Sequence, residues 1–148
     1  MPATLRFDPV DVDHLSGDID VEILDQDDDP NHVLEITMPW KVQVDWRLFG
    51  PIAAAIGGTW EVNVFVESIG QGFEGEVGSA TKALTDLEAG SSVTNRKYQT
   101  IINVPANTPP NTGVYKPVVL ITYKNDSGDI MAMAGFSEAP LINFYQSA

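Results

Sequence analysis

The sequence predicts an all-β protein, an antiparallel β-sandwich of about seven to nine short strands. Two stretches carry this prediction. From Trp40 to Leu48 apolar residues alternate with polar or charged ones, and the alternation returns from Trp60 to Glu67. Successive side chains of a strand point to opposite faces, so each stretch has one apolar face and one wet face. Strands of this kind form antiparallel sheets that bury the apolar face against a second layer.

The other strands follow from the same alternation and from the turn residues between them. The expected strands are, in order, Ile19–Ile23, Val33–Thr37, Trp40–Leu48, Trp60–Glu67, Phe73–Val77, Tyr98–Val104, Tyr115–Lys124, Ile130–Phe136 and Leu141–Tyr145. The segment from Thr81 to Gly90 (81–90) fits either one short helix, with Thr81 as its N-cap, or a further strand. Val118 to Ile121 is apolar on both faces, which favours a central place in a sheet.

Length and charge define the organisation of the chain. Its 148 residues suffice for one domain with a core. We expect residues 1–18 to form an acidic, loosely ordered N-terminal arm and residues 19–148 to form a single β-sandwich domain. The net charge is −13, and residues 1–35 hold eleven acidic residues but one basic residue, Arg6. Such a chain is repelled by nucleic acid and by anionic membranes, so we expect neither as a partner.

Missing residue types and segments exclude further classes. The chain has no cysteine, which excludes disulfides, thiolate metal sites and cysteine nucleophiles. No apolar run approaches the roughly 20 residues of a membrane-spanning helix, and the first residues do not resemble a signal peptide. We therefore expect a cytoplasmic protein.

Three features between residues 40 and 136 occur together. They are the two consecutive tryptophan strands, Ile102-Asn103-Val104-Pro105 before a proline-rich crossing, and Gly113-Val114-Tyr115 opening a long strand. In these features the chain resembles the immunoglobulin-like and fibronectin-III-like superfamily. In those families a tyrosine at this corner ties the crossing loop to the strand through its hydroxyl, which implies that role for Tyr115. The chain departs from the antibody pattern by lacking both cysteines. Pro117, inside the strand, indicates an edge or a bulge there.

The acidic turn is the candidate metal site. Asp25, Asp27, Asp29 and Asn31 offer the oxygen ligands that calcium prefers, without the glycine and glutamate spacing of an EF-hand. The alternative is a solvated turn that keeps the protein soluble. His14 and His32 are isolated, which is typical of exposed loop histidines rather than of a zinc site.

We predict no enzymatic activity. The sequence has neither the Gly-x-Ser-x-Gly elbow nor the Ser-x-x-Lys motif. Glu61 and Glu67 share a strand face, but at strand rise they lie roughly 20 Å apart, too far for a pair of catalytic carboxylates.

The predicted function is a non-catalytic interaction module, either an accessory subunit or a homo-oligomeric assembly protein. Its partner is another protein or a second copy of the chain. Apolar residues outside the core pattern indicate the interface, because exposed apolar patches mark contact sites; they are Pro51, Ile52, Ile56, Phe65 and Phe73. The alternative function is a small-ligand module for calcium or for a carbohydrate, the latter stacking on Phe65, Phe73 or Tyr145. Apart from calcium we expect no cofactor.

Overall fold

The computed structural model describes residues 3–7, 16–50, 57–127 and 130–147. These residues form ten strands and no helix, so no described segment is a helix long and apolar enough to cross a membrane. The strands are β1 (Ala3–Phe7), β2 (Ser16–Leu24), β3 (Val33–Glu35), β4 (Trp40–Phe49), β5 (Thr59–Ser68), β6 (Gly75–Ala83), β7 (Asn95–Val104), β8 (Gly113–Lys124), β9 (Ile130–Glu138) and β10 (Ile142–Tyr145). The predicted all-β fold is confirmed.

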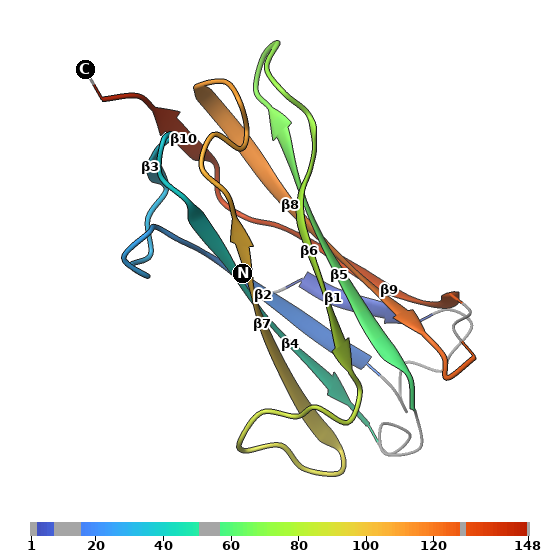
Figure 1. Ribbon diagram of the computed structural model, residues 1–148. Coiled ribbons are helices and arrows are strands. Elements are labelled where there is room, and N and C mark those ends of the chain that lie inside the picture. Colours follow the sequence, from blue (N-terminus) through green and yellow to red (C-terminus); the bar gives the residue numbers. More distant parts are fainter. Residues whose placement is uncertain (1–2, 8–15, 51–56, 128–129, 148) are drawn as a thin grey trace.

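The strands form two layers that pack face to face (Figure 1). Sheet A has the order β1-β2-β4-β7, and all its pairs are antiparallel. Sheet B has β6, β5 and β8 in that order, and on the far side of β8 both β9 and β10 pair with it. β3 runs parallel to β10 at the end of sheet B. β1 also pairs with β9, so it joins the two sheets along one side.

The apolar faces of the two sheets make one core. Trp40, Trp46 and Trp60 are 2%, 1% and 0% exposed, as the alternation predicts. Trp46 meets Trp60 edge-on, with ring centroids 6.2 Å apart, and stacks on Tyr98 at 5.5 Å. Edge-to-face and offset contacts of this kind add to the burial of the rings themselves. The two tryptophan strands therefore lie in different sheets and meet through their indoles.

The corner before β8 contains the expected hydrogen bond. The Tyr115 hydroxyl donates to the backbone carbonyl of Asn111 at 2.8 Å, so the crossing loop is tied to the strand that follows it. Tyr115 is fully buried, and its ring packs edge-on against Phe144 of β10.

Pro117 lies where β8 changes its neighbour. The pairing with β9 reaches Val118, and the pairing with β10 involves Tyr115. The backbone N–H of Ala139 donates to the Pro117 carbonyl at 3.0 Å, so the backbone groups of Pro117 face this junction. Because one neighbouring strand has ended and the next has not begun, the missing N–H of proline costs little ladder bonding there.

Three segments differ from the sequence-based expectation. The helix considered for 81–90 is absent: β6 runs to Ala83, and turns follow it. The periodicity of Leu84 and Leu87 is therefore not helical, and only Leu84 is buried. Part of the segment 1–18 expected as a loose arm is paired, since β1 lies between β2 and β9 and β2 begins at Ser16. β6 is nine residues long, not the short strand expected at Phe73–Val77.

Candidate functional site

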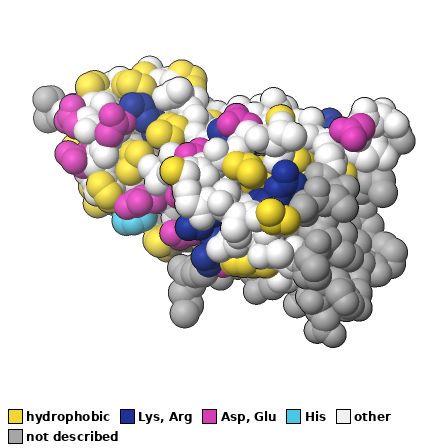
Figure 2. All heavy atoms as spheres, turned by 90° about the horizontal axis from the view of Figure 1, so that it is seen from below, with side chains coloured by type: hydrophobic (Ala, Val, Ile, Leu, Met, Phe, Trp, Pro, Cys, Tyr) yellow, Lys and Arg dark blue, Asp and Glu magenta, His cyan; other side chains and the backbone are white. Residues whose placement is uncertain are grey.

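The outer faces of the two sheets differ in chemistry. On sheet A the outward side chains are mostly polar or charged, and β2 contributes Asp18, Asp20 and Glu22. On sheet B the outward face combines charged residues with a group of apolar ones. Figure 2 shows the molecule from below, where charged side chains of both signs stand next to apolar ones.

Four apolar side chains lie together on the outer face of sheet B. Phe65 of β5 is in register with Val118 of β8, and Leu120 of β8 is in register with Phe136 of β9. Partners directly opposite in a sheet share a face and touch. Phe136 is 58% exposed, and the other three are partly exposed. We call Phe65, Val118, Leu120 and Phe136 the apolar strip.

Ion pairs border the apolar strip along the strands. On one side Lys116 Nζ lies 3.2 Å from Glu67 and 3.4 Å from Glu138, and these carboxylates raise the pKa of Lys116. On the other side Lys124 Nζ lies 2.6 Å from Glu61. Exposed pairs of this kind contribute little to stability. Their placement gives the strip the apolar centre and polar rim that are typical of protein contact surfaces.

A second apolar group continues the same face beyond Lys116. Asn143 of β10 lies in register between Val33 of β3 and Val114 of β8. Val33 and Val114 are 53% and 36% exposed, and Leu141, just before β10, is 50% exposed. Exposed apolar residues therefore recur from β9 to β3 on this face.

The predicted interface residues fall in three places. Phe65 lies in the apolar strip. Phe73 is partly buried against the core and its ring lies over Gly75, so it belongs to no exposed platform. Pro51, Ile52 and Ile56 lie outside the described residues.

Sequence reasoning missed Val118, Leu120 and Phe136. The signal was present in the run Val118–Ile121, which is apolar on both faces. β8 is central in its sheet, as that pattern predicts, with β5 on one side and β9 and β10 on the other. The outward residues of the run, Val118 and Leu120, are nevertheless only partly buried among the described residues. A strand that is apolar on both faces can therefore be central in its sheet and still leave one face partly exposed.

The acidic turn is organised by its own backbone. The Asp25 carboxylate accepts hydrogen bonds from the backbone N–H groups of Asp27 and Asp29, at 2.9 and 3.0 Å. The side-chain amide nitrogen of Asn31 lies 3.5 Å from Asp25 Oδ2. The bond from Asp29 is the main cause that lowers the pKa of Asp25. No group of three or more acidic or histidine side chains in the described residues is arranged to hold a metal ion. Calcium binding at this turn stays a prediction.

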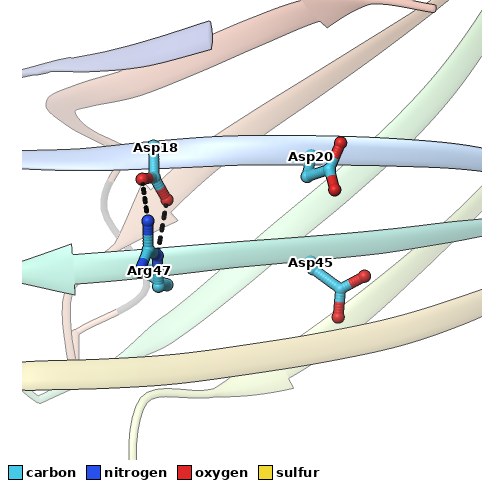
Figure 3. A pocket seen from close by; sticks show the side chains of 4 residues that line it. All are labelled: Asp18, Asp20, Asp45 and Arg47. Carbon is cyan, nitrogen blue, oxygen red and sulfur yellow. Dashed lines mark hydrogen bonds and ion pairs between the residues drawn. The ribbon is translucent and has the colours of Figure 1, made fainter. Parts of the chain in front are cut away.

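A shallow hollow lies on the outer face of sheet A (Figure 3). Arg47 makes a bidentate ion pair with Asp18, while Asp20 stands in register with Asp45 on the neighbouring strand. Asp45 accepts hydrogen bonds from two glutamine amides, Gln43 at 3.0 Å and Gln99 at 2.8 Å. The volume is about 230 Å³, below the roughly 300–1,000 Å³ of typical small-molecule sites.

No protein-family model and no curated protein sequence matches the chain. Among solved structures it is similar to the CARDB domain of the PF1109 protein from Pyrococcus furiosus, crystallised with di-metal ions. The identity is 13% and the TM-score 0.46, over 88% of this chain and 96% of that one. It is also similar to a β-glucosidase from Listeria innocua (11%, TM-score 0.44, 87% of this chain but 17% of that one). A third is Spo0M, a sporulation control protein from Bacillus subtilis (12%, TM-score 0.36, 88% and 50%).

At these identities the likeness is confined to the β-sandwich architecture, and no site residue is transferred from these proteins. The class that the fold defines is a two-layered antiparallel β-sandwich. Among the described residues, the apolar strip lies on the outer face of sheet B.

Proposed function

We propose that this chain is a non-catalytic interaction module that binds a protein partner through the outer face of sheet B. The observation that carries the proposal is the apolar strip, in which Phe136 is 58% exposed on a strand of the sheet rather than in a loop. Exposed apolar side chains that group together inside a polar rim are typical of contact sites.

The order of strands supports a finer assignment to the fibronectin-III-like group. β2-β4-β7 form one sheet and β6-β5-β8-β9 the other, and the Tyr115 hydroxyl ties the crossing loop before β8. Domains of this architecture host many functions, so the assignment fits an interaction module without identifying its partner.

The charged residues around the apolar strip indicate which charge to expect on the partner's surface. Three glutamates, Glu61, Glu67 and Glu138, surround the apolar strip with two lysines, Lys116 and Lys124. The complementary surface would present apolar side chains at its centre and an excess of lysine or arginine around them.

The test is an affinity pull-down from native lysate with the unmodified protein and with Phe136→Lys. The substitution puts a charge on the most exposed side chain of the strip, so the domain should keep its melting temperature. Val93→Lys is the matched control, because Val93 is 68% exposed and lies in the turn before β7 of sheet A, outside the strip on sheet B. We expect a stoichiometric partner that Phe136→Lys loses and Val93→Lys keeps. A partner retained by both variants, or none with the unmodified protein, would contradict the proposal.

A further inference from the structure

The open edge of sheet A is β7. Sheet A ends with β7 on one side, and on the other side β1 continues into sheet B through β9 (Figure 1). The segment before β7 covers the start of this edge. The Glu88 N–H donates to the Lys97 carbonyl at 2.8 Å, and the Lys97 N–H donates to Ser91 Oγ at 2.9 Å. Both backbone groups of Lys97 therefore point away from β4.

The direction of the backbone groups alternates from one residue of β7 to the next. In an antiparallel strand the N–H and C=O of one residue point to the same side of the strand. The N–H and C=O of every second residue point to that same side. Gln99, Ile101 and Asn103 consequently face the open edge as Lys97 does. Among the described residues no backbone hydrogen bond reaches these three from that side. The uncovered edge begins after Lys97 and ends at Pro105, where the chain leaves the sheet.

The uncovered edge lacks the features that normally protect an edge strand. Charged residues, prolines and bulges discourage the addition of another strand, and glycine weakens the strand that contains it. Tyr98–Val104 has no charged residue, no glycine and no proline, in a chain of net charge −13. The edge strand of sheet B is different: β6 contains Lys82 and two glycines, and its register with β5 shifts at Val64/Phe65.

We propose that two copies of this chain pair along β7, antiparallel, with the two-fold axis at Ile101. Gln99 and Asn103 lie two residues before and two residues after Ile101, so the three residues that face the edge are symmetric about Ile101. In this register Ile101 pairs with the partner's Ile101, and Gln99 pairs with the partner's Asn103. The backbone N–H and C=O of Gln99, Ile101 and Asn103 then each gain a hydrogen bond. The side chain of Ile101, 46% exposed on the outer face, contacts that of its own copy.

Charge allows this pairing despite the net charge of −13. The paired residues are neutral, and the acidic strand β2 lies two strands from the edge. In the dimer the two copies of β2 are five strand spacings apart, roughly 24 Å at about 4.8 Å per spacing. This distance exceeds the Debye length of about 8 Å at physiological ionic strength, so repulsion between them is screened.

The assembly closes at two copies. An isologous contact uses the same edge on both partners, and the β1 side of sheet A is already paired with β9. The contact is short, so the dimer is expected to form in a concentration-dependent way. The β7 dimer uses a different surface from the apolar strip, so a result against one proposal leaves the other unaffected.

A single cysteine tests the register. The chain has no cysteine. Opposed residues in a hydrogen-bonded antiparallel pair have Cα atoms about 5.5 Å apart, within the roughly 4.4–6.8 Å that a disulfide spans. Under mild oxidation Ile101→Cys should form a disulfide-linked dimer within minutes, while Val93→Cys and Phe136→Cys, both at more exposed positions, should remain monomeric for much longer.

Equal cross-linking of Ile101→Cys and Val93→Cys would mean random collision and would overturn the proposal. Preferential cross-linking of Phe136→Cys would place self-association on sheet B and would overturn it as well. Sedimentation equilibrium gives a second readout without cysteines. Ile101→Lys should weaken dimerisation at least tenfold, whereas Phe136→Lys should leave it unchanged. A dissociation constant unaffected by Ile101→Lys, or a monomer at every concentration, would refute the β7 dimer.

Discussion

The hydroxyl of Tyr115 and the backbone carbonyl of Asn111 are 2.8 Å apart, four residues from each other along the chain. This bond ties the end of the crossing loop to the beginning of β8. Tyr115 is buried beside Phe144, so the bond is shielded on the side of the core.

Replacing Tyr115 with phenylalanine should lower the free energy of unfolding by about 1 kcal/mol, the usual net contribution of one hydrogen bond. The ring and its packing remain, so the loss isolates the hydroxyl. Urea unfolding of Tyr115→Phe and of Tyr145→Phe measures it, the latter being a control on a 44% exposed tyrosine. Equal effects in the two variants would show that the corner bond contributes nothing.

The indoles of Trp40 and Trp46 provide a matched pair. Both side chains are buried, but Trp40 Nε1 donates to the Thr108 carbonyl at 2.7 Å, whereas Trp46 Nε1 has no hydrogen-bond partner among the described residues. Substitution with phenylalanine removes similar volume at both positions. Trp40→Phe should therefore cost about 1 kcal/mol more than Trp46→Phe, because only the former breaks a hydrogen bond. Chemical denaturation of the two variants gives the comparison, and a larger loss for Trp46→Phe would contradict it.

Gly78 of β6 lies against Ile102 of β7 across the open side of the sandwich. A Cβ at position 78 would come within 2.5 Å of Ile102 Cγ2, closer than real side chains approach. Gly78→Ala should lower the free energy of unfolding by about 1–3 kcal/mol, as overpacking does. The neighbouring exposed Ser79→Ala is the control.

A double-mutant cycle identifies the cause of that loss. Ile102→Ala removes the atom that Gly78→Ala would strike, so the double variant should be more stable than the sum of the single effects allows. Strict additivity would mean that the cost of Gly78→Ala arises elsewhere.

The acidic turn should become less stable as the pH falls. Hydrogen bonds from Asp29 and Asp27 lower the pKa of Asp25 below its ordinary value of 3.8, so the folded state holds this proton less tightly than the unfolded state. The stabilisation is therefore present above pH 3.8 and is lost as the pH falls through the lower, folded pKa. Carboxyl-detected NMR should give a midpoint below 3.8 for Asp25. In Asp25→Asn, the pH dependence of unfolding in that range should become shallower, and an unchanged slope would contradict the assignment.

Period-two alternation determined the class of fold by itself. It placed Trp40, Trp46 and Trp60 in the core and predicted nearly every strand, because facing inward or outward is a local property of an extended chain. The same reasoning found Phe65 on a wet face, where the structure places it in the apolar strip. Local propensity was insufficient at 81–90, where strand pairing of β6 with β5 decided between two alternatives that the sequence left open.

The neighbours of most strands were decided only by the tertiary structure. The pairing of Val118 with Phe65 joins residues far apart along the chain, and no local pattern encodes it. The hairpin of β8 and β9, which pairs Leu120 with Phe136, is the exception, because the turn residues between the two strands predict it. The tertiary structure also decided the open edge at Gln99, Ile101 and Asn103, because an edge is defined by the absence of a further neighbour in the sheet. The sequence thus determined which side chains face outward, and long-range pairing determined which of them form a common surface.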